Sequence, residues 1–241
     1  MKHISAIIFG AAIVIAAYFL GNAYIQRANP PQMISVTGLG NENFTSDLIV
    51  WEGQFSTNST VLKTAFDQLN QDKEIVREYL TSKGIDTKSI IFNSVQTTEM
   101  RDNQYENGNY VGNIFKGYQL VQTLKIESED VALIEGVSRE ITELLNKGVQ
   151  FNSLPPRYYY TKLADLKIEM ISKATEDARI RAEKIAENAG SNLGDLVSAN
   201  MGVFQITGQN SGEDYSWGGA YNTSSKNKTA SITMRLEYKV K

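Results

Sequence analysis

The side chains best suited to catalysis are scarce in this 241-residue chain, which limits the reactions open to it. The only histidine is His3, which precedes the first apolar segment, and cysteine is absent. Without an imidazole or a thiol in the rest of the sequence, one chain cannot build a Ser-His-Asp triad, a His-ligated zinc site or a cysteine nucleophile. We therefore expect a non-enzyme with no catalytic residue, no metal ligand and no cofactor.

Carboxylates are the remaining candidates for acid–base chemistry. Glu127, Glu129 and Asp130 lie close together, but they precede a predicted helix, where acidic side chains interact favourably with the helix dipole. A hydrolase of wall glycans would need two carboxylates that face each other across a cleft, and no pair stands out by its position in the sequence. A carboxylate-dependent cell-wall hydrolase is kept only as an alternative function.

The most unusual polar segment is Gln209–Lys228, which is rich in Gly, Ser and Asn but also carries aromatic side chains. One interpretation is a long hairpin loop without a function of its own. The other is a contact loop, because aromatic side chains provide large contact areas for a partner or a neighbouring subunit. The candidate contact residues are Glu213, Asp214, Tyr215, Trp217 and Tyr221.

The first 27 residues form an apolar segment that we interpret as a membrane anchor or an export signal. The run from Ile4 to Ile25 has no charged residue and is just long enough to span the hydrocarbon layer of a bilayer as a helix. The residues expected to contact lipid are Ile4, Ile8, Ile13, Ile15 and Leu20.

Two fates of this segment are open. Gly21-Asn22-Ala23 has the small residues that a signal peptidase requires, so cleavage would leave a periplasmic or outer-membrane-associated protein. We favour an uncleaved single-pass anchor, because the apolar run is long for a signal and Arg27 suits the far membrane interface. The body would then be exported and would remain attached to the cell membrane. Residues 28–33, which contain two prolines, are expected to form a stiff linker.

The rest of the chain, residues 34–241, predicts an α+β fold. Helical spacing of apolar residues alternates with strand-like alternation, most clearly in Ala230–Val240. The expected order is β-β-α-β-β-α-β-α-β-β, with a mostly antiparallel sheet and amphipathic helices packed on one face, preceded by one N-terminal transmembrane helix. Arg101–Asn113, rich in Asn and Gly, is expected to be a long hairpin loop.

One helix carries a distinctive stripe of small residues. Ala174, Ala178, Ala182 and Ala186 recur at every fourth position and would lie in a row, so that this helix can approach its packing partner closely. Three features together resemble the SIMPL family, also called DUF541. They are this ladder with its end at Ala189-Gly190, the opening strand Ile34–Gly40 with its Val-x-Gly-x-Gly pattern, and Gly117-Tyr118 before an alternating strand. Gly38 and Gly40 are expected to permit a turn or a bulge.

The resemblance implies a bacterial cell-envelope protein without a known reaction. It also implies a role in envelope integrity or stress tolerance, and self-association, since some relatives form large ring-like homo-oligomers. We therefore expect a homo-oligomer with the membrane and an envelope protein as further partners. The net charge of −3 argues against a nucleic-acid partner. A periplasmic ligand-binding module is the main alternative.

Overall fold

The computed structural model describes the backbone of residues 2–28 and 32–241 and the side chains of residues 9–25 and 32–241. The elements are α1 (Lys2–Ala28), β1 (Met33–Thr45), β2 (Leu48–Ser59), α2 (Leu62–Ser82), β3 (Ile90–Phe92), β4 (Gln96–Glu106), β5 (Asn109–Ser128), α3 (Val131–Glu140), β6 (Phe151–Ser153), β7 (Arg157–Tyr159), α4 (Leu163–Asn188), β8 (Leu193–Met201), β9 (Gln205–Gly208) and β10 (Asn227–Val240). Short 3₁₀ helices occupy Thr87–Ser89 and Ile141–Lys147. The expected α+β class with antiparallel strand pairing is confirmed.

The apolar N-terminal segment forms one continuous helix, α1. Ile13, Ile15 and Leu20 are exposed on it, whereas the side chains of Ile4 and Ile8 lie outside the described residues. Within the described part of the chain, no helix is both long and apolar enough to cross a membrane. The predicted transmembrane span therefore has no support in the structure. The prolines of the expected linker, Pro30 and Pro31, also lie outside the described residues.

The body divides into two compact units, each built from separate segments of the chain. The first unit contains Met1–Gly40, Met170–Val203 and Ile232–Lys241, and the second contains Asn41–Glu169 and Phe204–Ser231. The strands form two sheets, whereas the sequence pattern suggested one.

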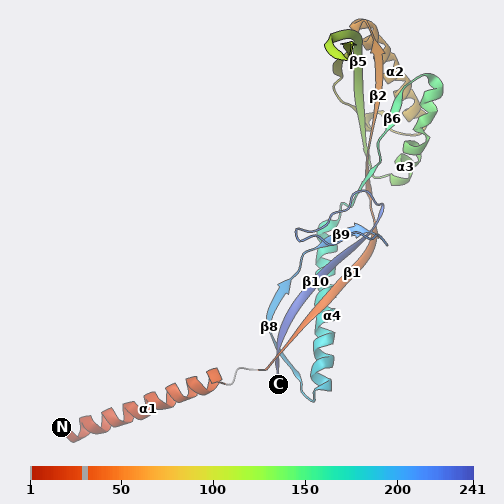
Figure 1. Ribbon diagram of the computed structural model, residues 1–241. Coiled ribbons are helices and arrows are strands. Elements are labelled where there is room, and N and C mark those ends of the chain that lie inside the picture. Colours follow the sequence, from red (N-terminus) through yellow and green to blue (C-terminus); the bar gives the residue numbers. More distant parts are fainter. Residues whose placement is uncertain (1, 29–31) are drawn as a thin grey trace. The chain divides into compact units, whose positions relative to one another are not determined.

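In the first unit, α4 packs on a sheet with the strand order β1-β10-β8 (Figure 1). The predicted alanine ladder is fully buried at this contact, with Ala174, Ala178 and Ala182 each 0% exposed. Gly38 and Gly40 lie inside β1, not in a turn as expected. A Cβ atom on Gly38 would lie only 2.1 Å from the carbonyl oxygen of Ala174. The glycines are needed because the helix backbone approaches the strand backbone this closely.

In the second unit, α2 and α3 cover one face of a sheet with the strand order β3-β5-β2-β6 (Figure 1). The core lies between these layers, where alternate residues of β2 meet both helices. Its largest fully buried side chains are Trp51 and Phe55, and the Trp51 indole nitrogen donates a hydrogen bond to Ser153 Oγ at 3.0 Å. The prediction of amphipathic helices on one face is confirmed for this sheet.

Candidate interaction surfaces

The predicted hairpin loop at Arg101–Asn113 is wrong, because most of it is strand. β5 pairs with β2 only from Tyr118 to Ser128, yet its pairing with β4 continues to Asn109. The segments Arg101–Glu106 and Asn109–Phe115 therefore pair with each other alone and form a two-stranded extension. We call these two segments and their turn the β4–β5 ribbon.

A tight turn closes the ribbon, and its residue types are a hairpin signal that the sequence already contains. Asn107 and Gly108 both have positive φ angles, 50° and 81°, as a two-residue type I′ turn requires. Asn-Gly is the residue pair that this turn prefers, so the hairpin could have been recognised. The many polar residues around the turn concealed it, because most of the ribbon's side chains are hydrophilic.

The ribbon exposes an unusual set of large apolar side chains. Tyr105 and Tyr110 contact each other edge to face, with ring centroids 6.0 Å apart, and the Tyr110 hydroxyl donates to Asn113 Oδ1 at 2.6 Å. A two-stranded hairpin without further packing is only marginally stable in water. The ribbon therefore offers apolar surface that a partner could cover. The exposed members are Tyr105, Tyr110, Val111, Ile114 and Phe115.

The predicted contact loop between β9 and β10 is held in place by one buried amide. The Gln205 side chain accepts hydrogen bonds from the backbone N–H groups of Ser216 at 3.2 Å and Ala220 at 2.7 Å. Its Nε2 donates to the Ser216 carbonyl oxygen at 2.7 Å. The middle of the loop, from Ser216 to Ala220, is therefore fixed to β9.

Two charged side chains hold the two ends of this loop. Glu213 accepts a hydrogen bond from the backbone N–H of Gly208 at 3.0 Å. Lys228 is 0% exposed and donates to the carbonyl oxygens of Asn222, at 2.8 Å, and Ser225. Burial without a hydrogen-bonded carboxylate lowers the pKa of Lys228 to about 8.

All five candidate contact residues are exposed, but some also make contacts within the protein. Glu213 accepts a hydrogen bond from Gly208, and the Tyr221 ring lies 6.5 Å from the Tyr159 ring. Tyr215 is mostly exposed, although its hydroxyl donates to Ser231 Oγ at 3.3 Å. Trp217 is 100% exposed, and Asp214 is also exposed. The loop thus presents an indole on a backbone that side-chain hydrogen bonds hold.

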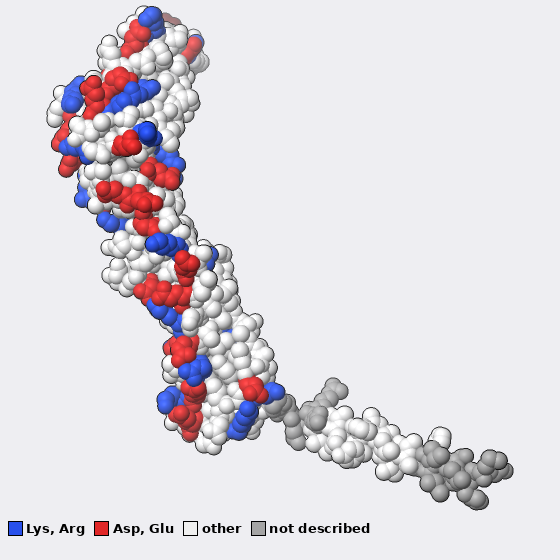
Figure 2. All heavy atoms as spheres, turned by 180° about the vertical axis from the view of Figure 1, so that it is seen from behind, with Lys and Arg blue, Asp and Glu red and all other residues white. Residues whose placement is uncertain are grey.

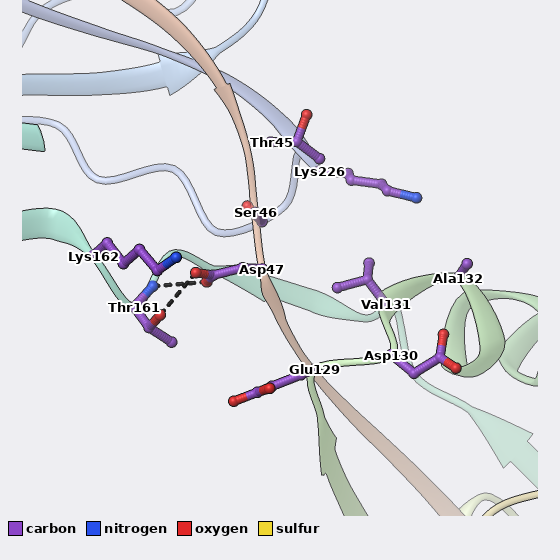
Figure 3. Close-up of a pocket in the computed structure, with 10 residues that line it drawn as sticks. All are labelled: Thr45, Ser46, Asp47, Glu129, Asp130, Val131, Ala132, Thr161, Lys162 and Lys226. Carbon is purple, nitrogen blue, oxygen red and sulfur yellow. Dashed lines mark hydrogen bonds between the residues drawn. The ribbon is translucent and has the colours of Figure 1, made fainter.

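A polar pocket of about 540 Å³ lies where β1 turns into β2 and α3 begins (Figure 3). Asp47 is turned toward Thr161 and accepts hydrogen bonds from its N–H and its hydroxyl, both at 2.7 Å. Asp130 accepts from Leu133 N at 3.0 Å and caps α3. Both carboxylates therefore hold the backbone. The pocket is lined by Thr45, Ser46, Asp47, Glu129, Asp130, Val131, Ala132, Thr161, Lys162 and Lys226.

Lys226, one of the two lysines that line this pocket, also forms an ion pair. Lys226 Nζ lies 3.1 Å from Glu135, and this ammonium group lowers the pKa of the Glu135 carboxyl. Ser46 Oγ is the one buried side-chain polar atom without a hydrogen-bond partner among the residues that the structure describes. The pocket thus consists mainly of groups that stabilise the fold, and Glu127, in the sequence cluster with Glu129 and Asp130, is not among its lining residues.

Charges of both signs are mixed over the molecular surface. On the face in Figure 2, Lys and Arg lie beside Asp and Glu, and neither sign forms a broad area. Many of these charges form surface pairs, such as Arg157 with Glu52 at 2.6 Å. Exposed pairs of this kind contribute little to stability. No group of three or more acidic, histidine or cysteine side chains in the described residues could hold a metal ion.

Comparison with known families gives one result. The sequence profile of the SIMPL family, described as "Protein of unknown function (DUF541)", matches residues 34–238. This match confirms the resemblance that the alanine ladder and the glycine pattern suggested. No curated protein matches the chain.

Proposed function

We propose, from the premise that this chain belongs to the SIMPL family, that it works by binding copies of itself or another envelope protein and not by catalysis. The observation that carries the proposal is the β4–β5 ribbon. Its exposed aromatic and aliphatic side chains lie on a paired backbone that no other strand extends. Large exposed apolar side chains gathered in one short segment are typical of interaction sites in soluble domains.

The loop before β10 supports the same proposal. Trp217 is fully exposed, and the loop backbone is fixed through Gln205 and Lys228. Tryptophan and tyrosine are the residue types that most often dominate binding energy at protein interfaces. An aromatic side chain on a pre-ordered backbone also loses less conformational entropy when it binds.

We further propose that α1 tethers this binding body to the cell membrane and that the body is exported. The support is the uncharged, apolar sequence from Ile4 to Ile25. The envelope location and a role in envelope integrity follow from the resemblance. Cleavage of the segment would leave the same body in the periplasm or at the outer membrane.

A hydrolytic function has little support by comparison. Two of the three carboxylates of the pocket in Figure 3, Asp47 and Asp130, bind backbone N–H groups, and Asp47 also binds a hydroxyl. A ligand-binding function without turnover has a separate observation in its favour, an amide-lined hollow on the second unit.

The experiment that tests the proposal measures self-association of the full chain in detergent by sedimentation equilibrium. The double variant Tyr105→Ser/Phe115→Ser removes two exposed rings from the ribbon without changing the core. Loss of one interface anchor typically costs about 2 kcal/mol, so we expect self-association to weaken by at least about thirtyfold even if only one of the two rings is an anchor. The Trp217→Ala variant should weaken it as well.

Ile168→Ser is the matched control, because Ile168 is also an exposed apolar residue, 69% exposed, but lies on α4. This variant should associate like the unmodified protein. A full chain that remains monomeric at high micromolar concentration, and that captures no envelope protein, would contradict the proposal. Equal association of the ribbon variant and the control would show that the ribbon is not part of the interface.

A further inference from the structure

The sheet of the second unit has a face that is opposite to α2 and α3 and carries a hollow of about 460 Å³. Side chains alternate along β2, so that Phe55 enters the core while Gln54 and Ser56 point to the opposite face. The register places Ser56 beside Val121, and Val121 beside Gln96. Short side chains therefore occupy the middle of this row.

Long amide side chains surround this low point. Gln54 pairs with Asn152 across β2 and β6, and it lies two residues before Ser56 on the same face. Gln119 lies two residues before Val121 on β5, and Gln150 leads into β6. Small residues at the centre and long residues around them produce the hollow. Its five amide residues are Gln54, Gln96, Gln119, Gln150 and Asn152.

This hollow differs from the pocket in Figure 3 in the hydrogen bonding of its polar side chains. Among the described residues, none of the five amide side chains has a hydrogen-bond partner in the protein. Each amide offers a carbonyl acceptor and two N–H donors. In the pocket of Figure 3, Asp47 and Asp130 hold the backbone, whereas the hollow leaves all five amides to water or a ligand.

The lining also restricts the charge of a ligand. It contains no ionisable side chain: besides the amides it has only Ser56, Val121 and Phe151. A charged ligand would lose hydration without gaining an opposite charge. An apolar ligand would strip water from the amides without replacing their hydrogen bonds. The favoured ligand is neutral and rich in groups that both donate and accept.

We propose that this hollow binds a neutral saccharide through hydroxyl–amide hydrogen bonds. A hydroxyl group donates one hydrogen bond and accepts others, so neighbouring sugar hydroxyls can satisfy both ends of an amide. Val121 supplies the apolar side chain of the lining for the C–H face of a sugar ring, whereas the Phe151 ring faces the core on the other side of the sheet. The site is separate from the ribbon and the contact loop and does not rest on the proposed self-association; it gives the ligand class for the alternative ligand-binding function.

An extended peptide fits this face less well. Peptides that bind sheets usually add a strand at an edge, where backbone groups are free. In the hollow, the backbones of β2 and β5 already pair with each other from Ile49 to Ser59. A peptide lying on this face would obtain side-chain hydrogen bonds alone.

The test uses saturation-transfer-difference NMR on the full chain in dodecylphosphocholine, a detergent without a sugar headgroup. The neutral probes are cellobiose and N,N′-diacetylchitobiose, glucuronic acid is the charged probe, and tetraglycine is the peptide probe. We expect transfer to a neutral disaccharide but not to glucuronic acid or tetraglycine. Gln119→Leu should weaken binding roughly fivefold, the effect of one lost neutral hydrogen bond.

Two further variants separate binding from folding. Ser56→Leu fills the centre of the hollow from the solvent face and should abolish transfer, while Gln71→Leu, an exposed glutamine on α2, should leave it unchanged. Unchanged circular dichroism spectra would show that both variants fold. Absence of transfer to either disaccharide, transfer to tetraglycine alone, or equal transfer in Ser56→Leu would each overturn the proposal.

Discussion

At the scale of single residues, the first unit depends on the close approach of the α4 backbone to the β1 backbone. Gly38 faces Ala174 and Ala178 so tightly that even a methyl group on Gly38 would collide with the helix backbone. The alanines contribute the other half of this contact, because a longer side chain would push α4 away from β1. The family signature of spaced glycines and a four-residue alanine repeat thus describes one packing contact viewed from its two sides.

Gly38→Ala is expected to destabilise the first unit by about 3 kcal/mol or more, because backbone atoms cannot move aside as side chains do. Gly136→Ala is the control, because a methyl group on Gly136, which lies in α3, would have no other atom within 4 Å. Alanine should stabilise that helix by about 0.5–1 kcal/mol. Urea unfolding measures both changes. A Gly38→Ala protein as stable as the unmodified one would contradict this account of the glycine.

The buried Lys228 makes a prediction about pH. Its pKa is about 8 in the folded protein and 10.5 in the reference state, because burial disfavours the charged amine. Between pH 8 and 10.5 the unfolded chain therefore binds more protons than the folded chain, so the free energy of unfolding from this group rises with pH. The rise is at most about 1.4 kcal/mol per pH unit.

Comparison with Lys228→Met isolates this effect, since methionine does not titrate. The unmodified protein should gain stability relative to the variant as the pH is raised from 8 to 10.5. Urea unfolding at several pH values within this window would measure the difference. Parallel stability curves would show that Lys228 keeps an ordinary pKa in the folded protein.

At the scale of elements, the sequence predicts best where a pattern is local. The alternation in Ala230–Val240 identifies β10, and helical spacing identifies α2 and α4, because each pattern reflects burial of one face. Assignment of the strands to two sheets depends on contacts between distant residues, and the sequence pattern did not reveal it. β7, which pairs with β2, was missed because its three residues, Arg157–Tyr159, are too few to show an alternating pattern.

The candidate surfaces, too, could be predicted from the sequence only where their pattern is local. The contact loop was recognised from its composition, but the fixing of its backbone by Gln205 was not, since that amide resembles an ordinary strand residue. The ribbon was mistaken for a loop because both of its faces are exposed, so no burial alternation marks it. The amide hollow exists only through register, which places residues of β2, β4, β5 and β6 side by side.

The ribbon turn gives a prediction that concerns one element. Gly108 has a φ angle of 81°, a conformation that is costly for a branched side chain, so Gly108→Val should destabilise the ribbon by about 1–2 kcal/mol. Amide hydrogen exchange should accelerate at Arg101–Phe115 and remain unchanged at core strands such as β2. Asn107→Gly, which permits the same turn, is the control and should alter exchange little. Uniform acceleration across the second unit would contradict a local effect.

At the scale of the whole molecule, both units are assembled from non-contiguous parts of the chain. Strand β10 is central to this arrangement, because it lies between β1 and β8 in the sheet of the first unit. Arg235 Nε on β10 donates to Ser35 Oγ on β1 at 3.2 Å, across 200 residues of sequence.

Deletion of Ile232–Lys241 should therefore unfold the first unit, although only ten of its residues are removed. Without these residues β8 loses all of its pairing with β10, because the paired residues of β10 run from Met234 to Val240. Hydrogen exchange of the deletion variant should show loss of protection in β1, β8 and the C-terminal part of α4. Amides of β2 and β5 serve as the internal reference. Retained protection of β8 would show that this sheet forms without its middle strand.

The position of β10 also sets the order of events during synthesis. β1 leaves the ribosome before the strands of the second unit, but its partner β10 follows only after all of them have been made. Until β10 emerges, the glycine-containing strand and the alanine face have no complete surface to pack on. Such a nascent chain cannot complete the sheet of its first unit until β10 has been made.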